Sequence, residues 1–414
     1  MKATDVFTPQ RLPTVTLVTD HLKEMKTTYD RAIEEGGKLI RVVGPSKSGK
    51  TVFIKSAAGT ENTVIVTGAG VTSPDLLWTR ILHAIGSDTG QSTERAESTS
   101  GGYKVSGEVE GSILVAKAKA NGEVSRGRSS EASLNQTKAM DLLQVVIADL
   151  ANSGLTIFVD DFHYIPTDVQ TTLAQQIKRA VEAGVRIATA AVPFRSEDVL
   201  RANDDLQGRI VDCHFKYWSD DELVAIAKKG FVTLNVVCSD GYALSMAKEA
   251  AGSPQLMQSL CLETCYAIGA PETAEQPIQI PDERGFLVQV CNAASKVVDF
   301  STTINVMREG PLIRGNPRKA YVLWDDTAED VYQILVRAIA MDPPTLHFSY
   351  SDMQARVAAL CKSDSPHFSD SCFHMARLVN DRSNSDKLDW NGEQHRLSIR
   401  DPYLLFGIRW GSDR

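Results

Sequence analysis

The sequence lacks the features that mark membrane and secreted proteins. No apolar run approaches the ~20 residues of a membrane-spanning helix, and the chain does not begin as a signal peptide does. The seven cysteines are an odd count, scattered from Cys213 to Cys372. The closest pair, Cys261 and Cys265, has no second pair or histidines nearby, which favours a core position over a metal site. We expect a cytoplasmic protein with reduced thiols and no membrane partner.

An excess of basic residues is also missing. Lys and Arg number 44 against 52 Asp and Glu, a net charge of −8. This balance argues against a protein that coats nucleic acid non-specifically, although it leaves room for a local basic patch. The length of 414 residues, with 43% hydrophobic and 23% charged residues, suits a globular chain of two or three domains.

One stretch fits the phosphate-binding pattern G-x-x-x-x-G-K-[ST], the P-loop, at every fixed position. It consists of Gly44, Pro45, Ser46, Lys47, Ser48, Gly49, Lys50 and Thr51. An apolar segment typical of a strand precedes it, and a helical segment follows, which is the context that the motif needs. We expect the backbone N–H groups to surround the phosphates of ATP, Lys50 to reach the β- and γ-phosphates, and Thr51 to ligate Mg²⁺.

A second motif supplies acidic groups. The apolar run 155–159 ends in Asp160 and Asp161. Downstream of a P-loop, such a segment is what a Walker B motif requires: Asp160 would hold the Mg²⁺ shell, and Asp161 would orient or deprotonate the attacking water. The two motifs together predict a Mg²⁺-dependent ATP hydrolase.

Strands and helices alternate through residue 192. This order predicts an α/β fold with a mostly parallel sheet, whose ligands bind at the carboxyl ends of the strands. The P-loop, the acidic pair and Thr189 are all expected there. Thr189 is a candidate sensor of the γ-phosphate, or a strand threonine bonded to a neighbour. The expected strands are 38–43, 62–68, 155–161 and 185–192, and the expected helices include 16–33, 74–85, 133–152 and 166–183.

Residues 87–134 interrupt this order, because Gly, Ser, Thr and charged residues dominate there. Apolar and polar residues alternate from Tyr103 to Val115, which indicates a β-ribbon. Two interpretations stay open: a flexible surface loop, or a projecting hairpin that contacts a neighbouring subunit or a ligand.

The second half of the chain is mainly helical. Helices are expected at 220–229, 243–250 and 255–268, followed by a linker over 269–282. A separate module follows, with helices 328–341, 349–360 and 369–379 and a hairpin that turns at Asn391 and Gly392. Three helices and a hairpin are the arrangement of a winged helix. The last of these helices mixes acidic and basic residues, which favours contact with protein over contact with DNA.

These motifs together resemble the AAA+ class of ATPases, in the branch of the origin-recognition initiators and the STAND signalling ATPases. The likeness includes the P-loop, Val159 to Asp161, the strand end at 190–195, the segment 206–210, and Trp218 with the helices after it. It implies an arginine-finger role for Arg209, which completes the site of the next subunit; the alternative is a surface arginine paired with an acid. The implied fold is a P-loop NTPase sheet with a helical lid, followed by a winged-helix-like α+β domain. Its domains are 1–215 (with the insertion 87–134), 216–270 and 285–414.

Two departures from that class bear on function. Asp161 stands where fast hydrolases carry Glu, and its shorter side chain holds water less closely, so slow turnover is expected. The segment 252–255 resembles the lid's sensor with Gln255 in place of Arg, and a neutral amide does not offset phosphate charge.

We therefore expect a slow, ATP-dependent assembly switch that forms a homo-oligomer and acts on a separate protein partner or effector. The alternative is a DNA-binding initiator or transposition-type ATPase regulator that uses the winged helix. A third hypothesis, a nucleotide-binding scaffold without turnover, is disfavoured by the joint presence of Asp160, Asp161 and Arg209.

Overall fold

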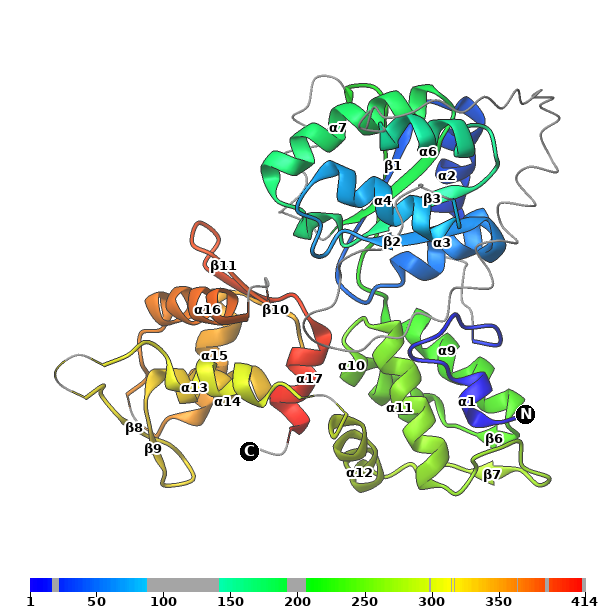
Figure 1. Ribbon diagram of the computed structural model, residues 1–414. Helices are drawn as coiled ribbons and strands as arrows, with labels where there is room; N and C mark the ends of the chain where they lie inside the picture. Colours follow the sequence, from blue (N-terminus) through cyan, green and yellow to red (C-terminus); the bar gives the residue numbers. More distant parts are fainter. Residues whose placement is uncertain are drawn as a thin grey trace, which may run out of the picture. The chain divides into compact units, whose positions relative to one another are not determined.

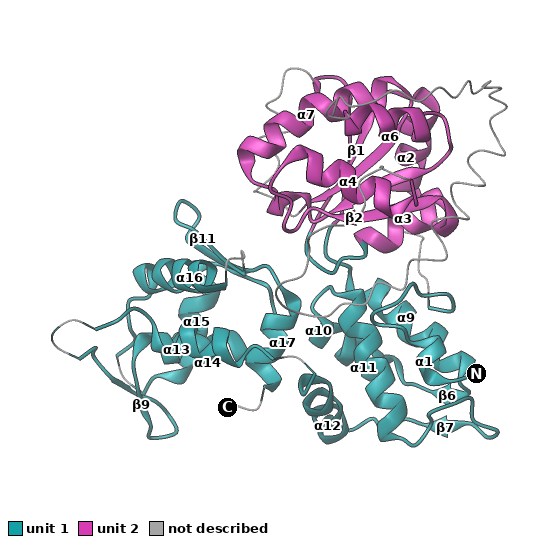
Figure 2. Ribbon diagram, in the orientation of Figure 1, with its two compact units in different colours: residues 1–18, 45–49, 216–414 teal, residues 19–44, 50–215 magenta. Residues whose placement is uncertain are grey.

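The computed structural model describes residues 1–16, 22–87, 141–191, 206–297, 299–313, 315, 317–362, 364–383 and 387–411. The predicted ribbon within 87–134 lies outside the described residues, as do 192–195 of the AAA+-like strand end. The chain divides into two units (Figure 2): residues 19–44 with 50–215, and residues 1–18, 45–49 and 216–414. Within the described ranges, no helix has the length and apolar character needed to cross a membrane.

The unit of residues 19–44 and 50–215 is built on a five-stranded sheet in the order β2-β3-β4-β1-β5, and every neighbouring pair is parallel. This confirms the predicted α/β fold with a parallel sheet. Its elements are α2 (Lys23–Glu35), β1 (Leu39–Val43), α3 (Lys50–Ala58), a 3-10 turn (Thr60–Asn62), β2 (Thr63–Thr67), α4 (Pro74–Ala84), α6 (Leu142–Leu150), β3 (Thr156–Asp160), a 3-10 turn (Phe162–Tyr164), α7 (Thr167–Glu182), β4 (Arg186–Ala191) and β5 (Ile210–His214).

Helices cover both faces of this sheet (Figure 1). Since successive strand residues point to opposite sides, neighbouring residues of one strand pack against different helices. Leu39 of β1 packs in a core with α4, α6 and α7. Ile40 and Val42 pack in a second core with α2 and α3. Buried strands with apolar residues on both faces are what a parallel sheet between two helical layers requires.

The second unit contains two apolar cores, and the first belongs to the helical lid. The lid core contains residues of α1 (Ala3–Val6), α9 (Asp220–Thr233), α10 (Asp240–Ala250), α11 (Pro254–Ala267) and α12 (Arg284–Ser295). Ser219 caps α9 through a capping box with Glu222, and Ser253 caps α11, so local polar residues fix where these helices begin. Helix α12, at the start of the predicted module 285–414, thus contributes to the lid core.

The remaining elements surround a separate apolar core. Strand β12 pairs with β10 on one side and with β11 on the other, so the predicted hairpin is part of a three-stranded sheet. The elements are α13 (Ser301–Glu309), β8 (Tyr321–Val322), β9 (Ala328–Glu329), α14 (Val331–Ala340), β10 (His347–Phe348), α15 (Tyr350–Leu360), α16 (Ser369–Ser383), β11 (Leu388–Asn391), β12 (Arg396–Ile399) and α17 (Pro402–Trp410).

Some predictions made from the sequence were wrong in detail. The helix predicted over 16–33 begins at Lys23 and ends at Glu35. The helix predicted over 328–341 begins at Val331, because Asp330 caps it and the two residues before pair with β8. The expected linker 269–282 contains β7 (Ile278–Gln279), which pairs with β6 (Val236–Val237). The hairpin β11–β12 turns through residues 392–395, so its loop is longer than the two-residue turn at Asn391 and Gly392.

Candidate nucleotide site

The P-loop leaves β1 at a point where only glycine fits. A Cβ atom on Gly44 would lie 2.3 Å from Cβ of Phe215, far inside the contact distance of two carbon atoms. The Gly44 N–H donates to the carbonyl of Ala191, and the Phe215 N–H donates to the carbonyl of Val43. Three strands therefore fix where the loop begins, at the carboxyl edge of the sheet.

Lys50 opens α3 and turns back over the loop. Its Nζ donates to the carbonyl of Gly44 at 2.9 Å. Burial lowers the pKa of Lys50 to about 8, although Asp160 and Asp161 act in the opposite direction. The loop thus places a desolvated ammonium group beside two carboxylates, and such a group interacts strongly with an anion.

Thr51 and Asp160 lie next to each other. The Thr51 hydroxyl donates to Oδ2 of Asp160 at 2.8 Å. Asp160 is the last residue of β3, and the other oxygen of its carboxylate accepts the Asp161 N–H at 2.9 Å. A hydroxyl and a carboxylate are oxygen donors of the kind that Mg²⁺ prefers, so these two predicted ligands fit that ion.

Asp161 adopts a left-handed backbone conformation, with φ of 56°. Burial raises the pKa of its carboxyl group, and the neighbouring Asp160 adds to this rise, while Lys50 opposes it. Gly68 makes room for this conformation, because a Cβ there would lie 2.8 Å from the Asp161 carbonyl. A non-glycine residue held with positive φ is a local strain that functional sites often contain.

Thr189 lies within β4, two residues before its end, and is 2% exposed. Its partners in the neighbouring strands are Val159 and Arg41. Arg41 in turn pairs with Asp212 of β5 at 2.7 Å. The structure thus places Thr189 in a buried polar row across the sheet, and its role as a phosphate sensor stays a prediction.

Arg209 lies at the other edge of the sheet. It directly precedes β5, and its carbonyl accepts the N–H of Leu39, the first residue of β1. A strand of five residues is roughly 16 Å long, so Arg209 does not reach the P-loop at the far end of β1. Its guanidinium pairs with Glu182 of α7 at 2.8 Å and is 38% exposed. This is the surface arginine paired with an acid that the sequence left open, and the arginine-finger role of Arg209 stays a prediction.

Comparison with protein-family models and with curated proteins found no match. Comparison with solved structures found a Walker-type ATPase of Pyrococcus abyssi, with a TM-score of 0.53 and 14% identity, covering 95% of this chain and 96% of that one. It also found the ORC2 protein of Aeropyrum pernix (TM-score 0.48, 11% identity, 98% and 96% covered) and Cdc6p of Pyrobaculum aerophilum (0.44, 12%, 98% and 96%).

The chain has the fold of a P-loop NTPase. The similarity to the Pyrococcus abyssi ATPase extends over nearly the whole of both chains and supports this assignment at the level of fold. In this P-loop NTPase the sequence motifs correctly predicted that the P-loop and the acidic pair lie at the carboxyl edge of the sheet. They could do so because each motif is a short, continuous run of residues.

The contacts of residues 45–49 could not be predicted from the sequence. They belong to the unit that contains the lid and the C-terminal module. The Trp218 indole N–H donates to the carbonyl of Ser48 at 3.0 Å, and the Ser48 hydroxyl donates to the carbonyl of Pro45. Ser46 is half-buried, and Gly49 adopts a positive φ of 96° with the Trp218 ring 4.0 Å from the position of a Cβ.

The predicted lid sensor, residues 252–255, is tied to the same tryptophan. The Trp218 N–H donates to the carbonyl of Gly252 at 3.0 Å. Gly252 has a positive φ, and a Cβ on it would lie 2.6 Å from Tyr217. Trp218 therefore connects the lid segment to the P-loop at Ser48. The sequence indicated only that Trp218 follows the last strand of the sheet.

Proposed function

We propose that this protein is an AAA+-type ATPase that binds ATP with Mg²⁺, hydrolyses it slowly and acts as an assembly switch. The observation that supports this most is the Thr51–Asp160 hydrogen bond, with Lys50 and Asp161 beside it. A cation, two metal-ligand oxygens and a separate carboxylate meet at the end of a P-loop, which is the set of groups that phosphoryl transfer to water requires.

Each side chain has a distinct part in this proposal. The P-loop amides and Lys50 bind the phosphates, and Thr51 and Asp160 would hold Mg²⁺, which supplies positive charge to the phosphate oxygens when bound. Asp161 orients the attacking water and accepts its proton. Its raised pKa makes it a stronger base than a solvated aspartate, while its short side chain places the base farther from the water than Glu would.

Assembly enters through Arg209. Because it lies at the edge of the sheet opposite the P-loop, it would complete the site of a neighbouring copy and exchange its Glu182 partner for phosphate. We therefore propose a homo-oligomer whose formation and turnover depend on each other. The effector would be a separate protein, since no nuclease or protease motif was found in the sequence.

The order of helices and hairpin in the C-terminal module keeps DNA binding as the second candidate. On α16, however, the exposed Arg377 lies 3.7 Å from Asp381, so part of its charge is neutralised within the helix. We place contact with protein first.

Asp161→Asn tests the proposal. The amide cannot accept a proton, so ATP binding should persist while hydrolysis falls by about 10²–10⁴-fold, the usual contribution of a general base. Titration calorimetry measures binding, and phosphate release measures turnover. Asp168→Asn, the same change at an exposed position of α7, is the control and should leave both unchanged. Undiminished turnover in Asp161→Asn would remove Asp161 from the reaction.

A further inference from the structure

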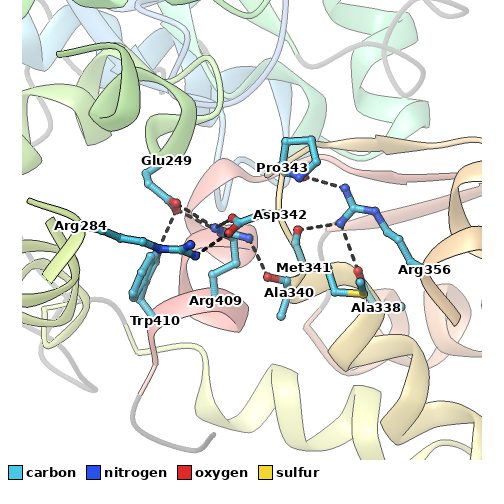
Figure 3. Close-up of polar contacts among 10 residues, drawn as sticks. All are labelled: Glu249, Arg284, Ala338, Ala340, Met341, Asp342, Pro343, Arg356, Arg409 and Trp410. Carbon is cyan, nitrogen blue, oxygen red and sulfur yellow. Dashed lines mark hydrogen bonds and ion pairs between the residues drawn. The ribbon is translucent and has the colours of Figure 1, made fainter. Parts of the chain in front are cut away.

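Helix α17 is fixed at one end by a buried cluster of charges (Figure 3). The Arg409 guanidinium makes two hydrogen bonds to the Glu249 carboxylate, at 3.0 and 2.8 Å, and the Trp410 indole N–H donates to the same carboxylate at 2.7 Å. Arg409 is 3% exposed and Glu249 7%. Since Glu249 lies near the end of α10, this cluster joins the lid to the last helix of the chain.

Further contacts extend the cluster into the C-terminal module. Arg409 also donates to the Ala340 carbonyl and to Asp342, which accepts a second hydrogen bond from Arg284 of α12. The side chains in Figure 3 converge from the lid, from α17 and from the end of α14. Charged hydrogen bonds therefore tie the carboxyl end of α17 to the lid and to the end of α14.

The other end of α17 contacts the P-loop. Asp401 caps the helix by accepting the Tyr403 N–H, and the same oxygen lies 3.6 Å from Nζ of Lys47. That ammonium group also lies 3.9 Å from the centre of the Tyr403 ring. Lys47 belongs to the segment 45–49 that groups with this unit, and its φ of 60° is in the left-handed region.

We propose that Asp401 senses the charge of the bound nucleotide through Lys47. This inference rests on the proposed function, and it adds a residue that distinguishes a triphosphate from a diphosphate. A P-loop surrounds its phosphates with the backbone of the loop that carries Lys47. A triphosphate therefore brings negative charge toward Asp401 and offers Lys47 a more highly charged partner.

The direction in which ATP changes the Lys47–Asp401 ion pair follows from these charges. ATP weakens the Lys47–Asp401 ion pair and releases the amino end of α17, while the Arg409 cluster keeps the other end in place. ADP, with less charge, weakens the pair less. Binding and release are linked, so the tie to Asp401 must lower the affinity for ATP by the same factor by which ATP loosens the tie.

The test uses Asp401→Asn in the full-length protein. Asn caps a helix as well as Asp does, so the helix start is kept while the charge is lost. The affinity for ATP should rise roughly 1.5- to 5-fold, the range for partly exposed ion pairs, and the affinity for ADP should rise less. Hydrogen exchange of residues 387–411 should increase with ATP in the unaltered protein but not in Asp401→Asn or in Lys47→Met.

Asp330→Asn is the matched control, because Asp330 also caps a helix of this module and pairs with a cation, Arg318, at 2.7 Å. It should leave ATP affinity and ATP-dependent exchange as they are. Unchanged or weaker ATP binding by Asp401→Asn, with exchange that still responds to ATP, would overturn the inference while the proposed function stands. Absence of ATP binding in the unaltered protein would instead reject the proposed function, and the inference with it.

Discussion

The Arg409 cluster predicts a large penalty for removing either of its central charges. In Glu249→Leu, the buried guanidinium of Arg409 loses two hydrogen bonds and keeps Asp342, which is 55% exposed, as its acidic partner in the cluster. Removing one partner of a buried ion pair costs about 3–5 kcal/mol. Arg409→Met should cost a similar amount, because the buried Glu249 carboxylate loses both guanidinium hydrogen bonds and keeps the neutral Trp410 N–H as its partner in the cluster.

The double variant Glu249→Leu with Arg409→Met should be much less destabilised than the sum of the two. It removes both charges; the Trp410 N–H then loses its bond to Glu249 and the Ala340 carbonyl its bond from Arg409, at a cost of about 1–3 kcal/mol. The coupling between the two sites should then exceed about 2 kcal/mol. Urea unfolding followed by tryptophan fluorescence measures this, since Trp410 lies in the cluster.

Arg377→Met provides the control, because Arg377 pairs with Asp381 on the surface of α16, where both side chains are 70% exposed. That pair should contribute no more than about 0.5 kcal/mol. Single variants of the cluster that cost less than about 1 kcal/mol, on the scale of this control, would show that the buried charges do not depend on each other. So would penalties that simply add in the double variant.

Two further predictions concern ligands. Lys50→Ala should weaken ATP binding about 10- to 150-fold, because a hydrogen bond to a charged group contributes roughly 1.5–3 kcal/mol; calorimetry showing unchanged affinity would contradict the P-loop assignment. The full-length protein should bind short duplex DNA weakly and with a shallow dependence on salt, since few phosphates would be neutralised; tight binding that falls steeply with salt in an anisotropy titration would make DNA the preferred partner.

The local motifs predicted the central part of the fold well. The P-loop, the strand before it and the acidic pair could be placed because each is a short run whose residue types have a fixed structural meaning. The parallel sheet followed from alternating strands and helices. Its strand order did not, because order depends on which strands pair in space.

Short pairings and distant contacts could not be predicted. Strands β6, β7 and β9 have two residues each, too few to show a period of two. The sequence pattern therefore predicts the residues of β9 as part of the helix that follows. The contacts of Lys47 with Asp401 and of Arg409 with Glu249 each join residues more than a hundred positions apart in the sequence. Nothing in the local sequence of a lysine or a glutamate shows which distant charge it meets.

If a neighbouring copy completes the ATPase site, two variants that are each inactive alone should restore activity when they are mixed. Lys50→Ala keeps the finger and, at an ATP concentration well below its weakened affinity, leaves its own site empty. Arg209→Ala keeps the nucleotide and loses the finger. In an equal mixture, about a quarter of head-to-tail interfaces combine an intact site with an intact finger.

The rate of ATP hydrolysis per subunit should rise with the concentration of the unaltered protein. Each variant alone should be inactive or show a rate that does not change with protein concentration. The mixture should recover about a quarter of the unaltered activity, the fraction of interfaces that are intact. Interfaces without the finger contribute little, because an arginine finger accelerates transfer by roughly 10³–10⁵-fold in other NTPases. ATP hydrolysis that does not depend on protein concentration, together with full activity of Arg209→Ala, would show that the site needs no arginine from a neighbouring copy.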